Sequence, residues 1–126
     1  LIWWVGMAAA LYLIYRFVVT RDWRIAFVLT GLAVTYLPWL LYGERTIFQF
    51  YTVVMIPFVA LALMLVAEHA LGPRDGPPER RAGATAAIAV FLAAAALISA
   101  FFYPVWTGME IPYPFWVLHN WLSTWV

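Results

Sequence analysis

Four long apolar blocks constrain this sequence more than any other feature. Each block is close to the roughly 20 residues that an α-helix needs to cross the hydrocarbon of a bilayer. In lipid, every backbone N–H and C=O must be paired within the segment, and an isolated apolar run achieves this only as a helix. A transmembrane β-barrel would show shorter segments of alternating polarity. The predicted transmembrane helices span residues 2–19, 25–42, 47–67 and 82–103.

The composition agrees with a membrane protein. Apolar residues make up 67% of the 126 residues, charged residues make up 10%, and the mean hydropathy is +0.90. Soluble domains have about half apolar residues and about a quarter charged ones. A water-soluble domain is therefore excluded. We predict an all-α membrane protein with a four-helix region at 1–103 and an aromatic-rich, extracytoplasmic interfacial tail at 104–126.

Charge and cysteine content exclude several classes of function. The net charge is only +1, so no field is present that would attract nucleic acid, and none is expected as a partner. The chain contains no cysteine, which excludes disulfides, thiolate metal sites and thiol nucleophiles. We expect no cofactor, no metal ligands and no catalytic residue of its own in this chain.

The distribution of arginine predicts how the helices are oriented. Arg16, Arg21 and Arg24 flank the first connector, Arg74, Arg80 and Arg81 lie in the third, and Arg45 alone lies in the second. Arginine and lysine in short loops stay on the cytoplasmic side. We therefore predict a multi-pass protein of the cell membrane in which loops 20–24 and 69–82 are cytoplasmic. Residues 43–46 and 104–126 are then extracytoplasmic, where tryptophan-rich segments favour the membrane interface.

The start of the chain indicates a piece of a longer protein, because Leu1 leads directly into an apolar run that contains Trp3 and Trp4. A secretory signal is the alternative. It would require a positively charged leader and a small-residue cleavage site, and neither precedes the first polar turn.

Charged residues inside the membrane would mark an ion or proton path. None of the four blocks holds a charge deeper than Arg16 and Glu68, which lie near block ends. This pattern argues against an ion-coupled transporter. Both residues are expected to lie near the cytoplasmic face as interfacial anchors.

Arg45 is the strongest candidate for a binding role, because it stands where the third predicted helix begins. Unpaired N–H groups and the helix dipole make that end positive, so a cation alone is unfavourable there. Together with a guanidinium they form a site for a phosphate group at the membrane surface. The alternative is that Arg45 pairs with Glu44 and reaches to the interface.

Aromatic residues follow Arg45 at helical spacing. Phe48 and Tyr51 continue the same helix face at intervals of three residues and would support a lipid headgroup, or simply pack against another helix. Pro38 and Pro57 each remove a backbone donor within an apolar block, and we expect them to kink or loosen it.

The tail contains two titratable side chains, Glu110 and His119. A carboxylate and an imidazole are able to act as an acid–base pair if they meet. The alternative is a layer of tryptophan at the headgroups. Its members would be Trp106, Trp116, Trp121 and Trp125.

Several short segments, in this order, resemble the protein O-mannosyltransferases of the actinobacterial kind. They are Tyr36-Leu-Pro-Trp-Leu-Leu-Tyr42, Arg45-Thr-Ile-Phe-Gln-Phe-Tyr51, Pro57-Phe58, Ile111-Pro-Tyr113 and Trp121-Leu-Ser-Thr-Trp125. The resemblance covers most of the chain and corresponds to the C-terminal four-helix membrane region of those enzymes, which are glycosyltransferases of the GT-C type.

The resemblance implies transfer of mannose from polyprenyl-phosphate-mannose to Ser or Thr of exported proteins on the outer side of the membrane. Arg45, Phe48 and Tyr51 would then bind the phosphate and lipid of the donor. The expected partners are membrane lipid, the lipid-linked donor, the exported acceptor and the upstream helices of the same enzyme.

Two departures from the family pattern limit this interpretation. The family's acidic Asp-Glu pair lies upstream of this chain, so the chain alone is expected to be inactive. His119-Asn120 stands where a more basic pair is expected. The alternatives are a non-catalytic four-helix subunit or scaffold and a fragment of a lipid-carrier transporter.

Overall fold

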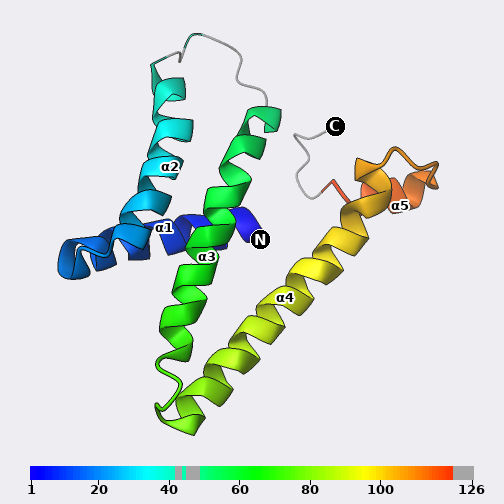
Figure 1. Cartoon of the computed structure of the whole chain (residues 1–126). Coiled ribbons are helices and arrows are strands. Elements are labelled where there is room, and N and C mark those ends of the chain that lie inside the picture. Colours follow the sequence, from blue (N-terminus) through cyan, green and yellow to red (C-terminus); the bar gives the residue numbers. More distant parts are fainter. Residues whose placement is uncertain (42–43, 45–48, 121–126) are drawn as a thin grey trace. The chain divides into compact units, whose positions relative to one another are not determined.

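The computed structural model describes residues 1–41, 44 and 49–120, without the side chains of 49–51. This part of the chain contains helices and no strand (Figure 1). The helices are α1 (Ile2–Thr20), α2 (Trp23–Leu40), the 3-10 helix η1 (Gln49–Met55), α3 (Ile56–Leu71), α4 (Pro78–Trp106) and α5 (Tyr113–Val117). Four helical segments, Ile2–Thr20, Trp23–Leu40, Thr52–Leu71 and Pro78–Trp106, are long and apolar enough to cross a membrane. The predicted all-α membrane fold is confirmed.

Local capping decides where α2 begins and α4 ends. The Asp22 side chain accepts a hydrogen bond of 2.9 Å from the backbone N–H of Arg24, so α2 starts before the predicted residue 25. α4 passes the predicted end at residue 103, continues through Pro104 and ends at Trp106, just before a turn at Gly108. Gly108 has a φ of 68°, and two backbone bonds close the turn, from Gly108 N to Val105 O and from Met109 N to Pro104 O. This pattern is a Schellman motif, in which glycine adopts the left-handed conformation without strain.

The two prolines expected to kink helices lie near helix ends. Pro57 occupies the first turn of α3, where its missing N–H would be unpaired in any case. The α-helix therefore begins at Ile56, after the 3-10 helix η1, and not at residue 47. Pro38 lies in the last turn of α2, and the Leu41 N–H donates to its carbonyl at 3.2 Å.

Residues Leu1–Thr85 form one compact unit, in which α1 lies across α3 (Figure 1). A Cβ atom placed on Gly6 would lie 2.7 Å from Cγ1 of Val59, so the two backbones approach closely there. Further along both helices, the rings of Tyr12 and His69 lie 5.8 Å apart. The second half of α1 therefore lies beside the last turns of α3.

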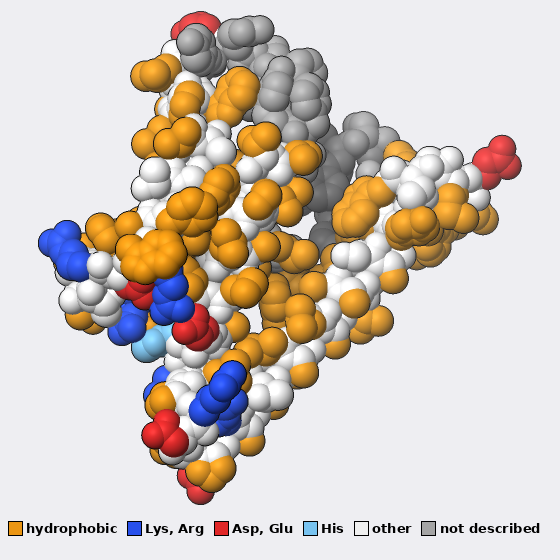
Figure 2. Space-filling view, viewed as in Figure 1, with side chains coloured by type: hydrophobic (Ala, Val, Ile, Leu, Met, Phe, Trp, Pro, Cys, Tyr) orange, Lys and Arg blue, Asp and Glu red, His pale blue; other side chains and the backbone are white. Residues whose placement is uncertain are grey.

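α2 runs opposite to α3. Its Gly31 lies directly against the ring of Phe58, near the start of α3, while Arg24 at its own start binds Glu68 near the end of α3. The contact between Arg24 and Glu68 brings the start of α2 to the end of α3. The α1–α2 connector and the α3–α4 connector therefore lie at one end of the unit, which we call the arginine-rich end. Figure 2 shows arginine side chains gathered on this part of the unit. That this end faces the cytoplasm stays a prediction from the distribution of arginine.

The interior of this unit is small. Its core consists of Ala9, Leu13, Ile25, Val28 and Ala62. At most 17% of the residues in any candidate span are buried. Apolar side chains cover the visible face of the helices (Figure 2). Such a surface is unfavourable in water and suits contact with lipid or with further membrane helices.

Residues Ala86–Val126 form the second unit. After the turn at Gly108, the short helix α5 packs its Phe115 against Phe101 of α4, with ring centres 6.1 Å apart. His119 lies beneath this contact and is 4% exposed. The described part of the tail is therefore a folded aromatic cluster on the end of α4.

Candidate functional site

The residues predicted to hold a donor phosphate are only partly described. Arg45 and Phe48 lie outside the described residues, and Tyr51 contributes only its backbone, within η1. Their proposed role stays a prediction. The segment that follows them leads into the start of α3, which lies at the opposite end of the first unit from the arginine-rich end.

A network centred on Arg24 joins the helices at the arginine-rich end. Its Nη1 donates to both oxygens of Glu68, at 3.1 and 3.0 Å. Its Nε and Nη2 donate to Oδ2 of Asp22, at 3.3 and 3.1 Å. One guanidinium thus connects the cap of α2 with the last turns of α3. The Arg24 and Glu68 side chains are 48% and 60% exposed, so water screens the pair and its stabilising effect is small.

The same network keeps Asp22 ionised. The side-chain hydrogen bonds from Arg24 lower the pKa of the Asp22 carboxyl below its usual value, and the bond from the Arg24 backbone N–H acts in the same direction. The positive charges of Arg24 and Arg16 add to this effect, and partial desolvation opposes it. Asp22 is therefore a carboxylate at neutral pH, as its capping role requires.

Arg80 donates to backbone carbonyl groups, whereas Arg24 donates to carboxylates. Its Nη2 donates to the carbonyl oxygen of His69 at 2.6 Å, and its Nε donates to that of Ala70 at 3.1 Å. These carbonyls belong to the last turn of α3, which has no intrahelical donors left for them. Arg80 therefore closes the C-terminal end of α3 and offsets the negative end of the helix dipole.

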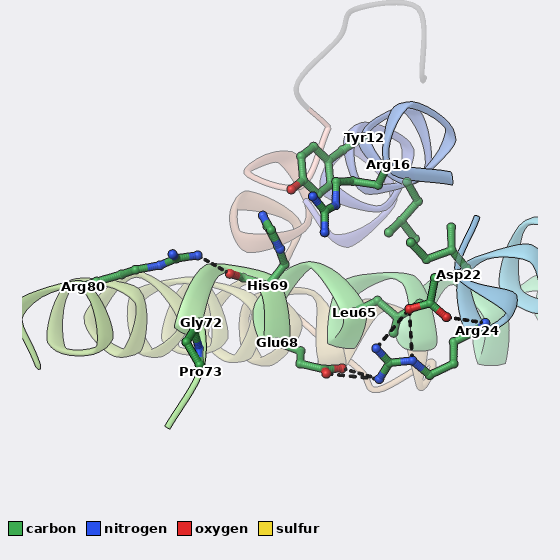
Figure 3. Close-up of a pocket in the computed structure, with 12 residues that line it drawn as sticks. Tyr12, Arg16, Asp22, Arg24, Leu65, Glu68, His69, Gly72, Pro73 and Arg80 are labelled. Atoms are coloured by element: carbon green, nitrogen blue, oxygen red, sulfur yellow. Dashed lines mark hydrogen bonds and ion pairs between the residues drawn. The ribbon is translucent and has the colours of Figure 1, made fainter. Parts of the chain in front are cut away.

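These side chains surround a cavity of about 340 Å³, shown in Figure 3. Tyr12 and Arg16 reach it from α1, Glu68 and His69 from α3, and Arg80 from the start of α4. Three arginines and two carboxylates, those of Asp22 and Glu68, line it, which gives a formal charge of +1 with His69 neutral. A cavity with this lining attracts anions. Sequence reasoning treated Arg16 and Glu68 as separate anchors and missed the cavity, although opposite charges in two connectors on one side were a usable signal.

The titratable groups of the tail do not form a pair in the described part of the chain. Both ring nitrogens of His119 are occupied, with Nδ1 at 2.8 Å from the Phe115 carbonyl oxygen and Nε2 at 2.8 Å from that of Phe101. The imidazole also stacks on the Phe101 ring at 4.1 Å. Glu110 is exposed, and no hydrogen bond or ion pair joins it to His119 among the described residues. His119 has a structural role that connects the tail to α4.

Comparison with known proteins decides the family. Over 123 residues the chain is 33% identical to polyprenol-phosphate-mannose–protein mannosyltransferases of Mycolicibacterium smegmatis and Mycobacterium tuberculosis. A protein of the same name from Corynebacterium glutamicum is 23% identical over 124 residues. Each match covers 98% of this chain. This chain is a homologue of the actinobacterial protein mannosyltransferases.

The mannosyltransferase homologue spans 24% of the length of these relatives. No protein-family model and no solved structure matches it. The resemblance predicted from short aromatic segments is confirmed, and it extends along nearly the whole chain. The four apolar helices and the membrane enzymes that it matches identify it as a multi-pass membrane protein of a glycosyltransferase family.

Proposed function

We propose that this chain is the C-terminal membrane part of a protein O-mannosyltransferase, which moves mannose from polyprenyl-phosphate-mannose to Ser or Thr hydroxyls of exported proteins. One observation carries the proposal, namely 33% identity over 98% of the chain to proteins whose name states this donor and a protein acceptor. Catalysis would depend on residues of the longer protein. The chain by itself would be inactive, and its part would be to help bind the donor.

Arg45 is the residue we propose as the clamp for the donor phosphate. A planar guanidinium matches two phosphate oxygens, and N–H groups near the start of a helix add to the attraction. Phe48 and Tyr51 would support the sugar phosphate and the first part of the lipid chain. The site would need no cofactor besides the donor substrate.

The direction of α3 supports an extracytoplasmic position for this site. The arginine-rich end would be cytoplasmic by the distribution of arginine. Because α3 begins at the opposite end of the unit, Arg45 and Glu44 would face the side on which exported acceptors are found. The chain has no cysteine, so a cysteine in place of Glu44, in the full-length protein with any other cysteine replaced by serine, would report this directly. A membrane-impermeant maleimide is expected to label it in intact cells, and labelling only after lysis would exclude the orientation.

Replacing Arg45 tests the donor clamp. In the full-length enzyme, Arg45→Ala removes a charge-assisted, two-pronged contact, and we expect kcat/KM for the lipid-linked donor to fall by about tenfold or more. Arg45→Lys keeps the charge without the fork and should recover part of the loss. Arg74→Ala, in the exposed α3–α4 connector, is the matched control. Mannose transfer by Arg45→Ala at the wild-type rate, at low donor concentration, would remove Arg45 from the site.

A further inference from the structure

The three arginines that line the cavity differ in how many hydrogen bonds they make. Arg24 is committed to Asp22 and Glu68, and Arg80 is committed to the carbonyls of α3. The Arg16 guanidinium is half-buried and makes no hydrogen bond or ion pair with any described residue. Arg16 thus acts on Asp22 through its charge alone, and its hydrogen-bond donors are unused inside the described fold.

Further hydrogen-bonding groups lie beside Arg16. The Tyr12 and His69 rings lie 5.8 Å apart, and neither the phenol hydroxyl nor the imidazole has a hydrogen-bond partner among the described residues. Figure 3 shows the side chains of Tyr12, Arg16 and His69 gathered on the same side of the cavity. Together they present a guanidinium fork, a hydroxyl and an imidazole to one space, which is the donor set that a phosphate group requires.

The C-terminal end of α3 lies at the cavity, but its carbonyl groups repel an anion less than those of an open helix end would. The carbonyls of the last turn of α3 would repel a negative group. Arg80 covers the carbonyl oxygens of His69 and Ala70, at 2.6 and 3.1 Å, and removes this repulsion. Arg24 pairs with both carboxylates of the lining, so these three side chains together keep a net charge of −1. The net positive charge of the cavity therefore comes from Arg16 and Arg80 together.

We propose that Arg16, with Tyr12 and His69, binds the phosphate of an anionic membrane lipid in this cavity. The lipid source follows from what adjoins the cavity. Arg24, Leu65 and Glu68 also line an apolar groove of about 430 Å³ between α2 and α3. The other residues of the groove are Trp23, Phe27, Val28, Leu61 and Met64. The groove meets the cavity at Arg24 and Glu68, so a lipid with its phosphate at Arg16 would reach past these residues to place part of an acyl chain in the groove.

This lipid site is separate from the proposed donor site. It lies at the arginine-rich end, whereas Arg45 precedes α3 at the other end of the unit. Arginine distribution predicts that the arginine-rich end faces the cytoplasm, where the leaflet carries anionic lipids. Occupancy would hold α1 and α3 together through their last turns. Loss of lipid binding and loss of donor use are therefore independent outcomes.

The test measures retention of lipid by the full-length protein. The protein is placed in nanodiscs of phosphatidylcholine with a minor share of phosphatidylglycerol, released in the mass spectrometer, and the bound phosphatidylglycerol is quantified. Arg16→Gln is expected to weaken retention by about tenfold, the loss of one charge-assisted contact. Arg74→Gln removes the same charge from the same end, outside the cavity, and should retain the lipid as the wild type does. Tyr12→Phe keeps the ring and should weaken retention a few-fold.

A second arm distinguishes the source of the phosphate. Inorganic phosphate is added to the lipid-free, detergent-solubilised protein, and thermal stability is measured. Stabilisation of the wild type but not of Arg16→Gln, with phosphatidylglycerol retention equal in both, would overturn the lipid assignment in favour of a soluble phosphate. Equal losses in Arg16→Gln and Arg74→Gln would show that only overall charge matters and would overturn the site. Unchanged retention in Arg16→Gln and Tyr12→Phe, without a phosphate effect, would overturn it as well.

Discussion

Gly31 offers the sharpest test of the packing between α2 and α3. A Cβ atom built on Gly31 falls against Cδ1, Cε1 and Cζ of Phe58, far inside van der Waals contact. Carbon atoms need about 3.5–4 Å, so the ring would have to move by more than about 1 Å. Phe27 packs on the same ring with centres 6.1 Å apart and limits that movement. Gly31→Ala should therefore force the two helices apart.

The expected size of the effect combines two terms. Overpacking a filled site costs about 1–3 kcal/mol. Replacing glycine by alanine inside a helix gains about 1 kcal/mol. The net loss for Gly31→Ala is then about 0–2 kcal/mol. Gly83→Ala, in α4, is the matched control, because nothing lies within 4 Å of its added Cβ and only the gain applies.

Unfolding of the full-length protein in mixed detergent micelles is the measurement. Gly31→Ala should be less stable than Gly83→Ala by about 1–3 kcal/mol, the overpacking term alone. In a Phe58→Ala background the clash is gone, and Gly31→Ala should become stabilising. If Gly31→Ala stabilised the protein as much as Gly83→Ala, with no coupling to Phe58, the close approach of α2 to α3 would be wrong.

Two further predictions concern the polar contacts. The pKa of Asp22 is lowered in the fold, chiefly by its hydrogen bond from Arg24, so its contribution to stability is present at neutral pH and is lost as the pH falls through that lowered pKa. Asp22→Asn should flatten the acid side of the thermal stability profile, and an unchanged slope would contradict the capping network. His119→Ala removes contacts to two carbonyls and should speed amide hydrogen exchange in α5 by about tenfold, measured by mass spectrometry, whereas Glu110→Gln should not. Equal exchange in both variants would show that His119 does not connect the tail to α4.

Much of the fold followed from the length of the apolar blocks. A run such as residues 82–103 has few alternatives in lipid, because its backbone groups must pair within the run. The ends of the helices were less predictable. The 3-10 helix before Ile56 and the extension of α4 to Trp106 depend on local turn geometry, which hydropathy does not report.

Of the candidate sites, one could be predicted from the sequence and others required the fold. Arg45 could be proposed from its position before an apolar run and from a family resemblance, both of which are properties of the chain order. The cavity around Arg16 could not be located, because Arg16 and His69 are far apart in the sequence and meet only when α1 packs across α3. The burial of His119 between Phe101 and Phe115 likewise requires the turn at Gly108.

The sequence by itself indicated that the chain lies in lipid, how many helices are able to cross the membrane, and the family. The length of the apolar blocks and the order of the short segments are properties of the chain alone. The tertiary structure decided which charges are neutralised and which remain free. Arg24 and Arg16 look alike in the sequence, and only the distances to Glu68 and Asp22 separate an arginine held in ion pairs from one left open to a ligand. Electrostatic interactions depend on distance in space, and the chain reports only distance along its own length.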